Sequence, residues 1–209
     1  MKAALIDILR RAPVVPVIVV HELEDAVPLA EALVTGGLPV LEVTLRTPVA
    51  LAAIEAMRRA VPDAIVGVGT LSNSEQFAAA RNAGAQFGVA PGLTPQLAAA
   101  SREFDWPFLP GVMTPTELMQ ARALGFGCCK LFPAQSAGGV AMLKALHAVF
   151  PDMAFCPTGG IQLDNAAQYL ALPNVLCVGG SWVSPPDLIK AGDWAAIRRL
   201  AQQAAALSK

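Results

Sequence analysis

Three charged side chains lie within or beside apolar segments, where an ionised group is expensive to bury. Glu42 and Arg46 belong to one such segment, and Lys130 belongs to another. A charge removed from water must be paired or used in chemistry. A lysine that is neutral part of the time attacks carbonyl carbon and forms Schiff bases. The three charges therefore predict either covalent chemistry at Lys130 or a structural ion pair.

Side-chain alternation gathers these charges on one side of two predicted strands. Successive side chains of a strand point to opposite faces, so Glu42, Thr44 and Arg46 share one face. Lys130 and Phe132 share a face of a second strand by the same rule. If both faces line the interior of a barrel, desolvation and a nearby arginine lower the pKa of Lys130. These features favour a Schiff-base role for Lys130. An ion pair with Glu42 would explain why the lysine is buried, but not why the other polar residues share the same interior face.

Hydroxyl groups and glycine pairs end other predicted strands. Thr70 and Thr158 could contact a substrate carboxylate or carbonyl, although a lone threonine is more often a cap. Glycine pairs stand at 159–160 and 179–180, and Ser181 follows the second pair. Glycine lets backbone N–H groups approach an anion, and barrels often bind phosphate after strands seven and eight. We expect a ligand with phosphate at one end and a carbonyl group near the lysine.

Eight apolar segments alternate with amphipathic segments rich in alanine and leucine. The apolar segments are 14–20, 40–45, 64–69, 86–90, 107–110, 128–132, 154–158 and 175–179. Many are continuously apolar, which is typical of parallel strands covered on both faces. Each interval has room for one helix, so we predict an α/β fold, a (β/α)8 TIM barrel with an extra N-terminal helix at 2–11. An open doubly wound sheet is the alternative, but its glycine-rich turn is missing after the first strand.

Capping sequences mark the predicted helix boundaries. A threonine followed by proline predicts an N-cap and the first helical residue. Such pairs stand at 47–48, 94–95 and 114–115. Residues 72–75 and 114–117 also have the pattern of capping boxes, and glycines at 36–37, 84 and 125 predict helix ends. Residues 184–187 predict the start of a short helix after the last strand.

The composition restricts the class of protein. The chain has 209 residues, of which 55% are hydrophobic and 15% charged, with 15 basic and 16 acidic side chains. We expect one domain over residues 1–209 and, from the balanced charge, no nucleic-acid partner. No apolar segment reaches the roughly 20 residues of a membrane helix, so no membrane partner is expected. The low content of charge favours an oligomer.

The cysteines and histidines predict no metal site. The cysteines form no CxxC motif, and His21 and His147 lie far apart. Each cysteine falls in an apolar segment, as expected for buried free thiols in the reducing cytoplasm. The four are Cys128, Cys129, Cys156 and Cys177.

A series of motifs runs in order from about residue 5 to the end of the chain. They are 14–20 with 22–24 (ELE), 42–47 (EVTLRT), 67–70 (GVGT), 91–94 (PGLT), 110–115 (PGVMTP), 130–134 (KLFPA), 157–160 (PTGG) and 179–182 (GGSW). Together they resemble the family of 2-keto-3-deoxy-6-phosphogluconate (KDPG) and 4-hydroxy-2-oxoglutarate (KHG) aldolases. Two positions differ from many of its members, because Ala90 stands in place of serine and Gln135 in place of an acid.

The resemblance implies a class I aldolase that is a homotrimeric (β/α)8 barrel and uses no metal or other cofactor. It assigns the Schiff base to Lys130 and general acid–base catalysis to Glu42. The residues implied to hold the substrate carboxylate and neighbouring oxygens, or to line the pocket, are Arg46, Thr70, Thr158, Pro91 and Phe132. Those implied to bind phosphate are Gly159, Gly160, Gly179, Gly180 and Ser181.

The implied reaction is reversible cleavage of 2-dehydro-3-deoxy-6-phospho-D-gluconate, a phosphosugar acid of the Entner–Doudoroff pathway. Its products are pyruvate and D-glyceraldehyde 3-phosphate, and the implied activity extends to cleavage of 4-hydroxy-2-oxoglutarate to pyruvate and glyoxylate. One alternative is a sister aldolase for the galactonate-derived epimer. The others are a phosphosugar isomerase or epimerase, which would need a facing acid and base but no covalent lysine adduct, and a phosphosugar-binding barrel, which has no need of a lysine in an apolar strand.

Overall fold

The computed structural model describes residues 2–207, and its strands form two curled parallel sheets. The strands are β1 (Val14–Ile18), β2 (Val40–Thr44), β3 (Ile65–Gly69), β4 (Gly88–Val89), β5 (Phe108–Leu109), β6 (Gly111–Val112), β7 (Cys128–Leu131), β8 (Ala154–Pro157) and β9 (Val178–Gly180). One sheet has the order β5-β4-β3-β2-β1-β9, and the other has β6-β7-β8. Each predicted apolar segment overlaps a strand, although β9 begins only at Val178 and ends one residue beyond segment 175–179, and only the fifth segment is followed at once by a further strand, β6.

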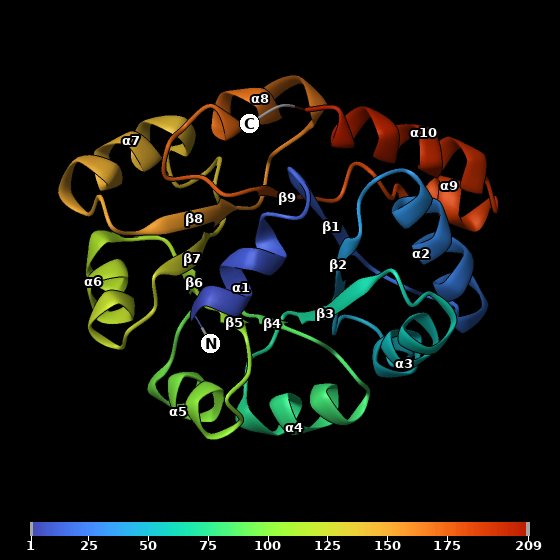
Figure 1. Ribbon diagram of the computed structural model, residues 1–209, viewed down its shortest axis with the longest axis horizontal. Helices are drawn as coiled ribbons and strands as arrows, with labels where there is room; N and C mark the ends of the chain where they lie inside the picture. The colour runs from blue at the N-terminus through green and yellow to red at the C-terminus, as the bar shows by residue number, and fades with distance from the viewer. Residues whose placement is uncertain (1, 208–209) are drawn as a thin grey trace.

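The two sheets meet at both edges. Between β5 and β6 the chain is interrupted only by Pro110, whose carbonyl oxygen accepts the Lys130 N–H of β7 at 2.8 Å. At the other edge, isolated parallel bridges join Phe155 to Val175 and Thr158 to Gly179. The strands therefore curl around a common interior (Figure 1).

The helices lie outside the strands and surround them in Figure 1, with α1 as the exception. They are α1 (Lys2–Leu9), α2 (Ala26–Thr35), α3 (Ala50–Ala60), α4 (Ser74–Asn82), α5 (Pro95–Glu103), α6 (Pro115–Ala123), α7 (Gly139–Val149), α8 (Leu163–Leu170), α9 (Pro186–Lys190) and α10 (Trp194–Ala205), with a 3-10 turn η1 (Leu23–Asp25) before α2. Strand and helix alternate along most of the chain, so the α/β class predicted from the apolar segments is confirmed. Within residues 2–207, no helix is long and apolar enough to cross a bilayer.

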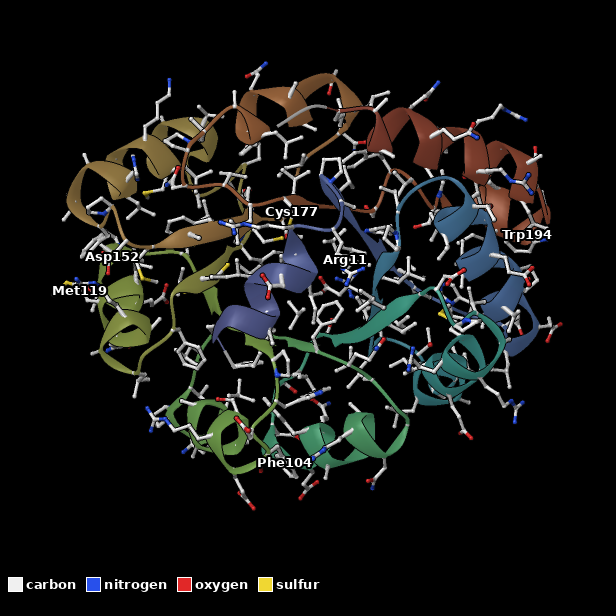
Figure 2. All side chains as sticks on the ribbon, in the orientation of Figure 1. Arg11, Phe104, Met119, Asp152, Cys177 and Trp194 are labelled. Atoms are coloured by element: carbon white, nitrogen blue, oxygen red, sulfur yellow. The ribbon has the colours of Figure 1, made fainter. Side chains whose placement is uncertain are left out.

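Alternation along each strand separates two hydrophobic clusters. Leu41 and Val43 of β2 pack outward against the helices, whereas Val40 belongs to an inner cluster. Leu5 and Leu9 of α1 join this inner cluster. The inner cluster includes residues at the first positions of β2 and β7, so α1 covers the amino-terminal end of the strands. In Figure 1, α1 lies across the middle of the ring, and Figure 2 shows Cys177 inside the ring while Met119 and Trp194 lie on its outside.

The predicted helix starts at 94–95, 114–115 and 184–187 are confirmed, the last by α9 at Pro186, whereas the start at 47–48 and the capping box at 72–75 are wrong. Thr94 and Thr114 accept N–H groups from their first helical turns, and Thr114 forms the predicted capping box with Glu117. The prediction at 47–48 is wrong, because α3 begins at Ala50 and the Thr47 hydroxyl donates to the Val20 carbonyl at 2.6 Å. The capping box at 72–75 is also wrong. There Asn73 is the N-cap, and it accepts the Gln76 N–H at 3.0 Å.

Candidate active site

Lys130 of β7 and Glu42 of β2 form a buried ion pair across the interior. Nζ of Lys130 lies 3.1 Å from Oε1 of Glu42, and the residues are 5% and 3% exposed. The two strands belong to different sheets and are not neighbours. Their side chains can meet only because both point inward, as the alternation predicted.

The burial of this ion pair is explained better by a chemical role than by a contribution to the stability of the fold. Removing two charges from water costs several kcal/mol per ion, and a buried ion pair is weak evidence for stabilisation. The contact gives the ammonium group of Lys130 an adjacent acceptor for its proton. Loss of that proton would leave a nucleophilic amine, and the carboxyl group would then hold a proton to return.

The neighbouring strand leaves space for the carboxylate. β3 pairs with β2, so Gly69 lies beside Thr44. A methyl group at Gly69 would overlap the Glu42 carboxylate. A glycine inside a strand is a signal of such close approach, although in the sequence Gly69 stood out only as part of the GVGT motif.

Phe132 and Pro91 lie close to the lysine, as expected for pocket residues. The Phe132 ring centroid is 5.3 Å from Lys130 Nζ, within cation–π range. Gly111 pairs with Lys130, and a methyl group at Gly111 would overlap the backbone of Pro91. Pro91 is exposed and Phe132 half-buried, so both lie at the rim rather than in the core.

The two glycine pairs lie side by side, with Gly159 and Gly160 on the loop after β8 and Gly179 and Gly180 as the last two residues of β9. Thr158 is bridged to Gly179, and a side chain at Gly179 would overlap the Thr158 hydroxyl and methyl groups. Gly159 and Gly160 have φ values of 103° and 75°, which favour glycine strongly over other residues. Ser181 is exposed next to these glycine pairs. The structure thus brings the five residues predicted to bind phosphate to one end of the strands.

Thr70 has the left-handed backbone conformation, with φ 67°. This conformation is an outlier for a β-branched residue, and such strain is concentrated at functional sites. Thr70 directly follows β3, whose last residue pairs with Thr44. The hydroxyl of Thr70 therefore lies at the same end of the strands as Thr158.

Arg46 lies beyond the end of β2, so strand alternation does not place its side chain. β2 ends at Thr44, and the Arg46 N–H donates to the Thr44 carbonyl at 2.8 Å in a tight turn. Alternation stops where the strand stops, and the Arg46 side chain is exposed. The residue still lies on the loop that follows β2, at the carboxyl end of the strands.

Cys128 and Cys129 precede the lysine on β7 and are poor nucleophiles. Burial raises the pKa of Cys129 to about 12 and raises the pKa of Cys128 well above its ordinary value. A thiol reacts as its thiolate, so neither competes with Lys130 for a carbonyl group. Among the residues described, no group of three or more His, Cys, Asp or Glu side chains is arranged to hold a metal ion.

The fold and the lysine–carboxylate pair define a class of α/β protein with an amine placed for carbonyl chemistry. Within that class, the chain belongs to the KDPG and KHG aldolase family, whose sequence profile matches residues 5–200. The family predicted from the motifs is therefore confirmed.

Relatives of known sequence and structure agree over almost the whole chain. The KHG/KDPG aldolase of Escherichia coli (strain K12) is 52% identical over 95% of this chain and 93% of the relative. The KDPG aldolase of Legionella pneumophila, solved with pyruvate captured at low pH as a covalent carbinolamine intermediate, is 48% identical with a TM-score of 0.95, over 97% of this chain and 98% of the other. The KDPG aldolase of Zymomonas mobilis ZM4, solved with 3-phosphoglycerate, is 45% identical with a TM-score of 0.95, over 100% and 98%.

Proposed function

We propose that this protein is a class I aldolase that reversibly cleaves 2-dehydro-3-deoxy-6-phospho-D-gluconate to pyruvate and D-glyceraldehyde 3-phosphate. The buried contact of 3.1 Å between Lys130 and Glu42 carries the proposal, because it supplies a nucleophile and an acid–base group together. The pyruvate carbinolamine of the Legionella relative supports the same chemistry. The KHG/KDPG name of the E. coli relative supports a second activity, on 4-hydroxy-2-oxoglutarate.

The reaction begins when the Lys130 ammonium group gives a proton to the Glu42 carboxylate. The free amine attacks the C2 ketone, and a C–N bond forms as the carbonyl π electrons move to oxygen. Glu42 protonates that oxygen, then takes one proton from the adduct nitrogen and passes it to the same oxygen. Water leaves, and an iminium ion remains on Lys130. The iminium ion is the electron sink for the next step.

Cleavage then breaks the bond between C3 and C4. Glu42, again a carboxylate, takes the C4 hydroxyl proton, and the electrons of the C3–C4 bond move into the iminium ion. D-Glyceraldehyde 3-phosphate leaves, and the enamine of pyruvate remains on Lys130. Protonation at C3 and hydrolysis by water release pyruvate and restore the amine. One carboxyl group serves each proton transfer, as its distance from Nζ allows.

The other predicted residues are proposed to bind the two ends of the substrate. Arg46, Thr70 and Thr158 would hold the carboxylate and neighbouring oxygens, and Pro91 and Phe132 would line the pocket. The phosphate group would bind at Gly159, Gly160, Gly179, Gly180 and Ser181. Support comes from the position of all these residues near the carboxyl ends of the strands, and from 3-phosphoglycerate in the Zymomonas relative.

The finer architecture is part of the same proposal. One closed (β/α)8 barrel over residues 1–209, with α1 as an addition, is supported by the contacts at both edges of the two sheets. The family resemblance supports a homotrimer, and the four buried free cysteines support a reducing cytoplasmic location. A sedimentation experiment that gives about three times the 21.7 kDa of one chain would support the trimer, and a monomer mass would refute it.

The proposal is tested by trapping the Schiff base. The protein is incubated with pyruvate and borohydride, and the modified residue is located by mass spectrometry. We expect a reduced adduct on Lys130 in the wild type and in Lys144→Ala, which removes an exposed lysine. Lys130→Ala should give no adduct and almost no turnover. A folded Lys130→Ala variant with normal activity would refute the proposed mechanism.

A further inference from the structure

The turn that carries Arg46 is attached to the neighbouring strands on both sides. On one side, the Leu45 N–H donates to the Gly69 carbonyl at 3.0 Å, which joins the turn to the end of β3. On the other side, the Thr47 hydroxyl donates at 2.6 Å to the carbonyl of Val20, which lies just beyond the end of β1. Arg46 stands between these two attachments, so the backbone is held both before and after it.

The contact made by the Thr47 hydroxyl is not part of a helix cap. α3 begins at Ala50 with Val49 as its N-cap, and the hydrogen bond joins positions that are 27 residues apart in the chain. The ladder between β1 and β2 ends at the pair formed by Ile18 and Val43. Beyond that pair, the Thr47 hydroxyl ties together the loops that follow the two strands.

The acceptor of this hydrogen bond is a fixed point, whereas Arg46 is a long side chain in contact with solvent. Val20 is fully buried, and a buried backbone carbonyl needs a donor. The Arg46 side chain is exposed, so it loses rotamer freedom when it binds an anion. A backbone that is already held in place leaves only the side chain to be ordered, and this lowers the cost of binding.

We propose that Thr47 is a positioning residue, whose hydroxyl holds the turn after β2 so that Arg46 can bind the carboxylate of the substrate. The inference rests on the proposed function, in which Arg46 holds that carboxylate. It gives Thr47 an effect on substrate binding that is exerted through Arg46 and not by contact with the substrate. The competing explanation is that the hydrogen bond contributes only to the stability of the fold.

Substitutions at Thr47 and Arg46 separate these explanations. Thr47→Val removes the hydroxyl but keeps a side chain of similar shape that is branched at Cβ, Thr47→Ala is a second variant without the hydroxyl, and Thr47→Ser restores the donor. Thr35→Val is the matched control, because the Thr35 hydroxyl also donates to a carbonyl at 2.6 Å, that of Glu31, but at the end of α2. Arg46→Ala removes the cation, and the double variant Thr47→Val/Arg46→Ala tests whether Thr47 acts through it.

The probe is pyruvate, which has the carboxylate but no phosphate group. In the proposed mechanism pyruvate and its enamine interconvert on the enzyme, so the methyl protons of pyruvate exchange in deuterated water at a rate that proton NMR measures. We expect Thr47→Val to raise the half-saturating pyruvate concentration about three- to tenfold, the effect of one lost neutral hydrogen bond, with the maximal exchange rate within about twofold of wild type. Thr47→Ser and Thr35→Val should leave that concentration close to the wild-type value. Arg46→Ala should raise it further than Thr47→Val does, and Thr47→Val added to Arg46→Ala should then have almost no effect.

Other results overturn the proposal. If Thr47→Val and Thr47→Ala unfold at lower denaturant concentration but reach half-saturation at the wild-type pyruvate concentration, the hydrogen bond serves only the fold. If Thr47→Val has the same effect with and without Arg46, or if Arg46→Ala binds pyruvate as the wild type does, Thr47 does not act through Arg46. Borohydride trapping keeps the two proposals apart. A wild type that forms no pyruvate adduct on Lys130 refutes the aldolase, whereas an adduct together with unchanged half-saturation in Thr47→Val refutes only the role of Thr47.

Discussion

The Glu42 carboxylate forms an ion pair with Lys130, and it has room in the interior because residue 69 is a glycine without a side chain. Glu42→Gln keeps the shape of the side chain and the contact with Nζ but removes the base. We expect kcat to fall by roughly 10²–10⁴-fold, the range for losing a general acid–base group. The measurement is steady-state turnover, with thermal unfolding to establish that the variant is folded. A loss below about tenfold would leave Glu42 as a structural partner of the lysine.

The contrast between Lys130 and Arg46 shows which site residues sequence alone can predict. Lys130 and Glu42 were predictable because a charge inside an apolar strand is rare, and strand parity fixes the side to which it points. Arg46 was placed by the same parity, but parity holds only as far as the strand. After β2 the chain turns away from the strand, and the Thr47 hydroxyl donates to the distant Val20 carbonyl at 2.6 Å. Contacts between distant residues of this kind leave no local pattern.

Gly69 provides a prediction about strand β3. The methyl group of Gly69→Ala would overlap the Glu42 carboxylate, so the carboxylate must move away from Lys130. We expect a large loss of kcat with a smaller effect on KM, measured by steady-state kinetics. Gly92→Ala is the control, because a methyl group there meets nothing within 4 Å. Equal activity in the two variants would mean that Glu42 tolerates displacement.

The capping box of α6 gives the protein a local dependence of stability on pH. Glu117 accepts the N–H groups of Met113 and Thr114 at 2.6 and 2.8 Å, and these hydrogen bonds lower its pKa from the ordinary 4.5. Because the folded pKa lies below the unfolded value, the stabilisation is present above pH 4.5 and is lost as pH falls through the folded pKa.

Glu117→Gln should therefore unfold at lower urea concentration than the wild type at pH 7, by up to about 1 kcal/mol, as is typical of a lost cap. The difference should shrink as the pH is lowered below 4.5, because the wild-type carboxylate becomes protonated. Glu103→Gln, at the end of α5, should show no such convergence. A difference between wild type and Glu117→Gln that is constant across this pH range would contradict the role of the carboxylate.

The two ends of the strands carry different kinds of residue. Lys130, Glu42 and the glycine pairs lie toward the carboxyl ends, whereas Leu5 and Leu9 of α1 join the inner cluster from the amino-terminal side. In the (β/α)8 barrel proposed above, the first end would carry the chemistry and the second would carry stability. The sequence predicted this division only in outline, because it placed a helix at residues 2–11 but gave no sign of where that helix packs.

Leu9→Ala tests this division. Leu9 is 1% exposed, so its truncation leaves a cavity in the inner cluster and should cost about 2–5 kcal/mol of the free energy of unfolding. Turnover below the melting temperature should remain close to wild type, because Lys130 and Glu42, the pair proposed to be catalytic, belong neither to α1 nor to the inner cluster. Asp7→Ala, an exposed position on the same helix, should change neither property. Denaturant unfolding and steady-state kinetics are measured on the same samples. A Leu9→Ala variant with unchanged stability and a lower kcat would show that α1 affects the active site, which contradicts this division.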